Sequence, residues 1–182
     1  MLCGIDEAGR GCLAGPLVVA GCVLHAPIAG LGDSKALSPR QRDTLFHHIT
    51  ASASFRLVWF SHTKVDTLGL SACLHHALSS LKAHFSDHEI LMDGNCTFNV
   101  SGIKTLVKAD ATIAEVSAAS ILAKVARDRY MLRMHQRHPQ YGFDKHKGYG
   151  SAYHMERIKT LGPSPLQRHS FKIKALRQPS LF

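Results

Sequence analysis

The chain has 182 residues, of which 45% are hydrophobic and 19% charged, a balance typical of a folded globular protein and unlike that of a disordered chain. No apolar run approaches the ~20 residues that a membrane span needs, and the N-terminus lacks the basic and apolar segments of a secretion signal. Lys and Arg outnumber Asp and Glu by 22 to 13, which gives a net charge of +9. This excess favours a polyanionic partner.

The five cysteines are an odd number and show no CxxC spacing. This pattern argues against a zinc site and is typical of small core residues in a reducing compartment. They are Cys3, Cys12, Cys22, Cys73 and Cys96. We therefore expect a cytoplasmic protein, with no membrane association.

The first half of the chain alternates strand and helix patterns. Residues 1–5 form a short apolar strand, and Asp6-Glu7-Ala8-Gly9-Arg10-Gly11 follows at once. Residues 15–24 and 55–60 are rich in β-branched and aromatic residues and predict two more strands. Between these two strands, Ser38-Pro39 supplies an N-cap and a proline at the first helical position of a helix over 39–51.

The second half of the chain continues this alternation. Apolar residues recur at spacings of three and four over 70–85 and predict a helix with one buried stripe. Strands are expected at 89–92 and 103–108. Thr112 and Glu115 have capping-box spacing ahead of a long Ala-rich helix that Pro139 bounds, and a last helix is expected near 150–161.

Strands that alternate with helices predict an α/β domain with a central sheet. We assign residues 1–139 to its core and residues 140–182 to a C-terminal loop, helix and basic tail of the same domain. No internal repeat or low-complexity tract is present.

Carboxylates follow three of the predicted strands. Asp6 and Glu7 end the first strand, Asp93 ends the fourth, and Asp110 follows the fifth. Acids at the ends of several strands of one sheet can converge at its edge, where α/β proteins bind ligands. Four such carboxylates repel one another unless hard cations such as Mg²⁺ or Mn²⁺ lie among them. Two ions ~4 Å apart would suit the hydrolysis of a phosphodiester. Each acid taken alone is more often a solvated strand end than a metal ligand, but all four in this pattern favour a metal site.

Six short blocks of the sequence, in the same order, resemble the signature of ribonuclease HII, the type 2 ribonuclease H. They are Gly4-Ile5-Asp6-Glu7-Ala8-Gly9-Arg10-Gly11, Asp33-Ser34-Lys35, Asp93-Gly94, Lys108-Ala109-Asp110, Ser117-Ala118-Ala119-Ser120-Ile121-Leu122-Ala123-Lys124-Val125 and His146-Lys147-Gly148-Tyr149-Gly150. With a weaker match near the C-terminus, the resemblance runs from residue 4 to about residue 171.

The resemblance implies a ribonuclease H-like fold: a five-stranded mixed β-sheet flanked by helices, with helical C-terminal elements. It implies a metal-dependent endoribonuclease that hydrolyses RNA in RNA–DNA hybrids and incises duplex DNA at embedded ribonucleotides. The products would carry a 3′-hydroxyl and a 5′-phosphate, and the biological roles would be ribonucleotide removal and RNA primer processing. By position, Asp6, Glu7, Asp93 and Asp110 match the four catalytic, metal-binding carboxylates of the family.

The resemblance also implies roles in substrate binding. Gly9-Arg10-Gly11 matches the loop that contacts the backbone around the scissile ribonucleotide. Its residues suit this role, because the glycines allow close approach of the substrate and Arg10 can hold a phosphate bidentately. Tyr149 matches a tyrosine that stacks near the sugar of the following deoxynucleotide. An anchor for the loop between two glycines is the alternative for Tyr149. Lys35 is expected on a phosphate, and a solvated loop lysine is the alternative.

The chain departs from the family pattern at three positions. Gly69, early in the second helix, stands where the family has Asn. Gln167 and His169 replace a His and an Arg of the C-terminal HRRSF motif, and their loss could weaken substrate contacts. None of these changes touches a predicted metal ligand.

Two other functions are compatible with parts of this pattern. Ribonuclease HIII carries an additional N-terminal domain, for which a chain with its catalytic motif at residue 6 leaves no room. A nucleic-acid-binding module with vestigial acids would not need all four carboxylates intact. We expect a nuclease that is a monomer.

The last five residues, Gln178-Pro179-Ser180-Leu181-Phe182, resemble the peptide by which bacterial repair proteins dock on the sliding clamp, apart from Pro179. Leu181 and Phe182 would enter an apolar pocket, and Gln178 would add polar contacts. A frayed or back-folded tail is an equally good interpretation.

Overall fold

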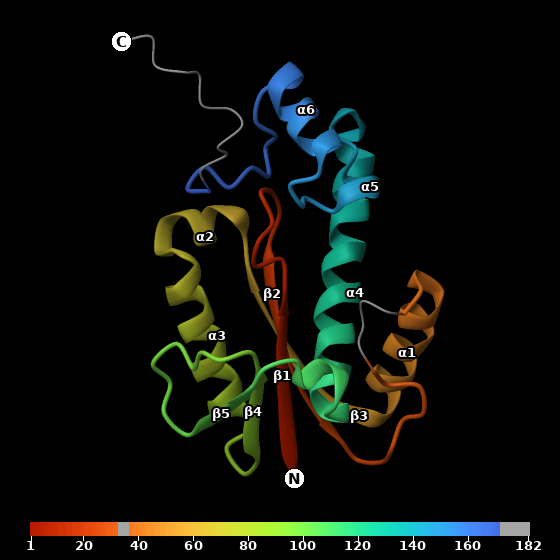
Figure 1. Ribbon diagram of the computed structural model, residues 1–182, viewed down its shortest axis with the longest axis vertical. Coiled ribbons are helices and arrows are strands. Elements are labelled where there is room, and N and C mark those ends of the chain that lie inside the picture. The colour runs from red at the N-terminus through yellow and green to blue at the C-terminus, as the bar shows by residue number, and fades with distance from the viewer. Residues whose placement is uncertain (33–36, 172–182) are drawn as a thin grey trace.

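The computed structural model describes residues 1–32 and 37–171. A five-stranded mixed sheet forms its centre, and helices cover both faces of that sheet (Figure 1). The strands are β1 (Leu2–Ala8), β2 (Leu17–Leu24), β3 (Ala53–Phe60), β4 (Glu89–Asp93) and β5 (Ile103–Leu106). The helices are α1 (Pro39–Ser52), α2 (His62–Leu68), α3 (Leu70–His84), α4 (Ala114–Arg137), α5 (Phe143–His146) and α6 (Ala152–Leu161), with short 3₁₀ turns at Ala109–Ala111 and Pro139–Tyr141.

The order of strands across the sheet is β3-β2-β1-β4-β5. β1 is antiparallel to β2, and β2 is antiparallel to β3, whereas β1, β4 and β5 run parallel to one another. The carboxyl ends of β1 and β4 therefore lie next to each other at one edge. This arrangement confirms the predicted mixed five-stranded sheet.

Each face of the sheet has its own apolar layer. On one face Ile5, Val19 and Met92 pack against α2 and α3. On the other face Val18 and Ala20 pack against α1 and the Ala-rich half of α4. Figure 1 shows α2 and α3 on the left of the sheet and α1 and α4 on the right. A fully buried Leu or Ile in these layers contributes ~1.5–3 kcal/mol to folding.

The start of α4 lies directly on β1. A Cβ added at Gly4 would stand 2.2 Å from the backbone carbon of Glu115, far closer than any side chain tolerates. Only glycine permits this approach, which places the first turns of α4 against the strand that carries Asp6. None of the helices in the described parts of the chain combines the length and apolarity that a membrane crossing requires.

The capping prediction for α1 is confirmed, and the one for α4 is wrong. Ser38 accepts a hydrogen bond from the backbone of Gln41, whose side chain accepts one from Ser38 in return. At α4 the N-cap is Ile113, which has no side-chain cap. The short 3₁₀ turn at Ala109–Ala111 takes up the chain before the helix and moves its start past Thr112.

Other differences lie at the ends of elements. β1 continues to Ala8 instead of ending at Ile5, because the residues up to Ala8 pair with β2. β5 ends at Leu106, and the helix α2 was not predicted. Gly69 lies between α2 and α3, with a φ of 81°, and gives α3 no capping side chain. Cys96 is exposed, while the other four cysteines are buried as expected.

Candidate active site

Three carboxylates from separate elements converge at the edge of the sheet. Asp6 comes from β1, Asp93 ends β4, and Asp110 lies in the 3₁₀ turn before α4. One ligand oxygen from each lies within 4.8 Å of the other two. Asp93 Oδ1 accepts a hydrogen bond of 2.8 Å from the backbone N–H of Ala109, which ties the turn that carries Asp110 to the end of β4.

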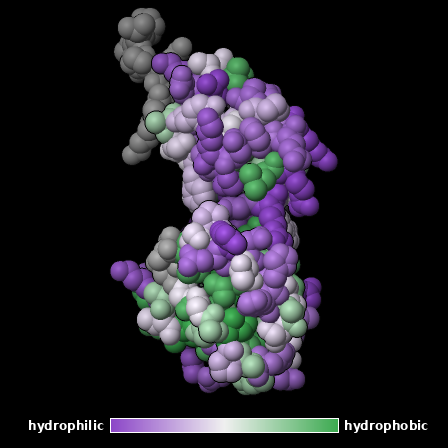
Figure 2. Space-filling model, turned by 90° about the vertical axis from the view of Figure 1, so that its right-hand side faces the viewer, coloured by the Kyte–Doolittle hydropathy of each residue, from purple (hydrophilic) through white to green (hydrophobic). Residues whose placement is uncertain are grey.

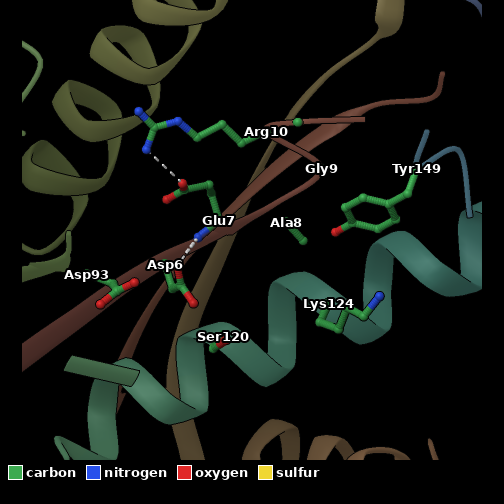
Figure 3. Close-up of a pocket in the computed structure, with 10 residues that line it drawn as sticks. Asp6, Glu7, Ala8, Gly9, Arg10, Asp93, Ser120, Lys124 and Tyr149 are labelled. Atoms are coloured by element: carbon green, nitrogen blue, oxygen red, sulfur yellow. Dashed lines mark hydrogen bonds and ion pairs between the residues drawn. The ribbon is translucent and has the colours of Figure 1, made fainter. Parts of the chain in front are cut away.

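Glu7 is not part of this group of three. Because β1 remains a strand through Ala8, neighbouring side chains point to opposite faces. Asp6 is directed toward α4 and Ser120, while Glu7 is directed toward Arg10, whose guanidinium lies 3.4 Å from its carboxylate (Figure 3). Glu7 nevertheless lines the same cavity of about 490 Å³ as Asp6 and Asp93.

The buried carboxylates repel one another electrostatically, and a bound cation would offset this repulsion. Burial, together with the negative charges of Glu7 and Asp93, raises the pKa of Asp6 to about 7, and the hydrogen bonds from Ser120 and the Glu7 backbone limit this rise. Asp6 is only 7% exposed and Asp110 4% exposed. Clustered carboxylate oxygens are the ligand set that hard divalent cations prefer, so these residues fit a metal site of the Mg²⁺ or Mn²⁺ type.

The loop after β1 forms another wall of the cavity. Gly9, Arg10 and Gly11 all line it. Gly9 has a φ of 93°, and a Cβ there would lie 2.3 Å from Arg127 Nε, so only glycine fits. Arg10 extends into solvent on the Glu7 side and lies over the ring of Phe98 at 5.4 Å.

Two fully buried arginines hold this loop, and sequence reasoning missed both. The Arg127 guanidinium donates to the carbonyls of Pro16 at 2.9 Å, Lys147 at 2.8 Å and Ala14 at 3.0 Å. Arg168 donates to the carbonyls of Gly15 at 2.9 Å and Arg10 at 3.3 Å. Arg127 lies close to Lys124 and Arg129 in the sequence of α4, so its context does not distinguish it from an exposed cation.

Tyr149 forms the far wall of the cavity and is 41% exposed. Its ring lies 5.4 Å from Lys124 Nζ and 5.5 Å from the Arg127 guanidinium carbon. Its backbone N–H donates to the His146 carbonyl at 2.8 Å, and its carbonyl pairs with His154 Nδ1 at 2.9 Å. The structure thus gives Tyr149 both an exposed ring and an anchored backbone.

Two stacked imidazoles support the Tyr149 loop from behind. The rings of His146 and His154 are 4.1 Å apart and within 13° of parallel. Burial lowers the pKa of His154 to about 4 and also lowers that of His146. Both rings are therefore neutral at physiological pH, which lets them stack without charge repulsion.

The remaining predicted positions fall into two groups. Lys35, Gln178, Leu181 and Phe182 lie outside the described residues. Gln167 is 4% exposed, and its backbone pairs with Ala14 inside the protein. His169 is exposed, and its backbone N–H donates to Asp66 at 2.8 Å.

Comparison with known proteins gives a consistent result. Residues 3–174 match the family model for ribonuclease HII. Ribonuclease HII of Campylobacter concisus is 54% identical over 182 residues, which cover 100% of this chain and 98% of the relative. Ribonuclease HII of Sulfurovum sp. is 50% identical over 181 residues, which cover 100% of this chain and 96% of the relative.

Two solved structures share this fold. The first is the complex of PCNA and ribonuclease HII from Archaeoglobus fulgidus, with a TM-score of 0.82 at 28% identity over 100% of this chain and 98% of the matched chain. The second is ribonuclease H2 from Pyrococcus horikoshii, with a TM-score of 0.68 at 26% identity over 94% of this chain and 93% of the other.

Proposed function

The chain belongs to the ribonuclease HII family and is therefore a metal-dependent endoribonuclease of RNA–DNA hybrids. We propose that the reaction takes place in the cavity lined by Asp6, Glu7 and Asp93. The observation that carries this assignment is the convergence of Asp6, Asp93 and Asp110 within 4.8 Å. Elsewhere in the described residues, no other group of three His, Cys, Asp or Glu side chains has ligand atoms this close together.

We assign metal binding to these three aspartates, with Glu7 as the fourth carboxylate. Glu7 joins them when it leaves Arg10, an exchange that costs little because a partly exposed ion pair contributes only ~0–1 kcal/mol. We propose two Mg²⁺ or Mn²⁺ ions, because four carboxylates supply more negative charge than one divalent ion neutralises. Bound divalent ions supply an activated water and neutralise charge at the phosphate during hydrolysis.

The protein residues around the carboxylates bind and orient the substrate. Lys124 and Arg10 lie on opposite sides of the cavity and can each hold a phosphate oxygen. Ser120 fixes Asp6 by hydrogen bonding, so its carboxylate keeps the direction it needs. The 3′-hydroxyl and 5′-phosphate products follow if the bond between phosphorus and the 3′ oxygen is broken.

We propose that the Gly9–Gly11 loop and Tyr149 recognise a ribonucleotide embedded in duplex DNA. The 2′-hydroxyl is the local feature that separates RNA from DNA. Backbone groups of Gly9 and Gly11 can approach it because no Cβ intervenes. Tyr149 would pack on the next sugar, where an added hydroxyl would crowd the ring.

The test is cleavage of a duplex that contains one ribonucleotide, with Mg²⁺, with Mn²⁺ and with chelator. We expect a single cut in the strand that contains the ribonucleotide, only when metal is present, and none in the matched all-DNA duplex. Cleavage in chelator, or of the all-DNA duplex at a similar rate, would overturn the assignment. Adding each metal separately shows which one supports the faster reaction.

We also propose a sliding clamp as a partner of the C-terminal peptide. The similarity of Gln178, Leu181 and Phe182 to the clamp-binding peptide supports this, as does the A. fulgidus relative, solved in complex with PCNA. Tethering to a clamp would raise the local concentration of the enzyme on newly made DNA.

A further inference from the structure

A second, basic groove lies between α1, α4 and α5 and has a volume of about 500 Å³. Its cationic side chains are Arg42 from α1, Lys124 and Arg129 from α4, and Lys145 and Lys147 from α5 and the residue that follows it. We propose that this groove binds the sugar–phosphate backbone of the duplex on the 3′ side of the ribonucleotide. This inference rests on the function proposed above.

The charge of the groove fits a polyanion. Against its five cations stand two carboxylates, Asp43 and Asp128, which leaves a surplus of three positive charges. Asp43 lies 2.6 Å from Arg129, and Asp128 lies 3.0 Å from Lys124, so the two acids orient those cations along the groove. Lys145 and Lys147 form no ion pair with a carboxylate in the described chain. Lys147 donates to the Asp144 carbonyl and Lys145 lies 4.9 Å from the centre of the Tyr153 ring, so the positive charges of both remain unneutralised.

The groove continues from the catalytic cavity. Lys124 lines both of them. Its ammonium lies 5.4 Å from the ring of Tyr149, on the side of the cavity away from the carboxylates. Since Tyr149 is placed at the deoxynucleotide that follows the ribonucleotide, a strand that passes it enters the groove with its 3′ flank.

The length of the groove determines how many base pairs of the duplex it can contact. The residues of α4 that line it, from Lys124 to Leu132, share one face of the helix and span about 12 Å at ~1.5 Å per residue. At ~3.4 Å per base pair this corresponds to about three to four base pairs. Figure 2 views this side of the molecule, where hydrophilic residues dominate the upper part, formed by α5, α6 and the C-terminal half of α4.

The experiment combines a variant that lacks two positive charges of the groove with substrates of different flank length. Arg42→Gln/Lys145→Gln removes one cation from each wall, and both residues lie outside the catalytic cavity. Lys104→Gln is the control, because Lys104 is an exposed lysine of β5, outside the groove, whose ammonium pairs with Glu89. Duplexes with one ribonucleotide carry a 3′ flank of about two or about twelve base pairs beside a constant long 5′ flank.

With the long 3′ flank, we expect kcat/KM of the double variant to fall about ten- to thirtyfold at ~0.15 M salt, and the slope of log affinity against log salt to fall by about 2. With the short 3′ flank, the double variant should match the wild type. Lys145→Gln alone should lower the slope by about 1, which tests the proposal even if the double variant folds poorly.

Two results would overturn the proposed role of the groove: equal losses of kcat/KM on both flank lengths, or an unchanged salt slope. Each of these leaves the proposed function intact as long as the wild type cuts the short substrate in a metal-dependent way. If the wild type cuts neither substrate, the proposed function is wrong, and so is the proposed role of the groove.

Discussion

Asp6→Asn is expected to stabilise the metal-free protein at alkaline pH, although it removes a proposed metal ligand. In the folded protein, burial and neighbouring carboxylates raise the pKa of Asp6 from 3.8 to about 7. The native state therefore holds this proton more tightly than the unfolded state does. The resulting stability is fully present below pH ~3.8 and is lost as the pH rises through ~7.

A shift of about three pKa units corresponds to ~4 kcal/mol at high pH. Between pH 5 and pH 8, this single group should cost the wild type about 2 to 3 kcal/mol of unfolding free energy. That is a large share of the ~5–15 kcal/mol of a typical domain. In Asp6→Asn the cost is absent, because the amide does not titrate.

The assay is urea unfolding of both proteins at pH 5 and pH 8 in chelator, with Asp87→Asn as a control at an exposed aspartate. The free energy of the wild type should fall more between the two pH values than that of Asp6→Asn, and Asp87→Asn should follow the wild type. Mg²⁺ at ~100 times its Kd should return ~2.7 kcal/mol to the wild type and much less to Asp6→Asn. Identical pH dependence in all three proteins would refute the reasoning.

Four further outcomes are expected. Asp93→Asn should abolish cleavage while duplex binding in a gel-shift assay stays within about threefold, because the basic phosphate contacts remain; near-normal turnover would contradict the metal assignment. Tyr149→Ala should lose more kcat/KM on a single embedded ribonucleotide than on a continuous hybrid, and equal losses would make Tyr149 a structural residue only. Arg127→Lys should lower the free energy of unfolding by ~2–4 kcal/mol in urea titrations, since one ammonium cannot replace three guanidinium hydrogen bonds; unchanged stability would argue against that role. A chain that ends at Arg177 should lose micromolar clamp binding and keep its activity on short duplexes, and equal binding by both chains would exclude the terminal peptide.

The succession of strands and helices along the chain was predictable because its signals are local. Alternating strand and helix patterns, the N-cap at Ser38 and carboxylates at the ends of strands all lie within a few residues of one another. The convergence of Asp6, Asp93 and Asp110 follows from the parallel order of β1, β4 and β5, which such alternation favours.

The contacts that shape the walls of the cavity were not predictable in this way. The direction of Glu7 depends on β1 continuing to Ala8, which is decided by pairing with β2. Arg127 is a charged residue on a helix, and such residues usually face solvent. Its three carbonyl partners lie at Ala14, Pro16 and Lys147, on loops that sequence patterns do not bring together.

The hydrogen bonds between the C-terminal segment and the loop after β1 have a consequence for the order in which the protein folds during synthesis. Gly15 donates its N–H to Leu166, and Arg168 binds the carbonyls of Arg10, Leu13 and Gly15. On the ribosome, β1 and its carboxylates emerge first, at ~5–20 residues per second, but the loop that faces the substrate finds its partners Arg127, Gly148 and Arg168 only as α4 and the C-terminal segment follow. The loop that lines the cavity can therefore complete its packing only after these later segments have been made.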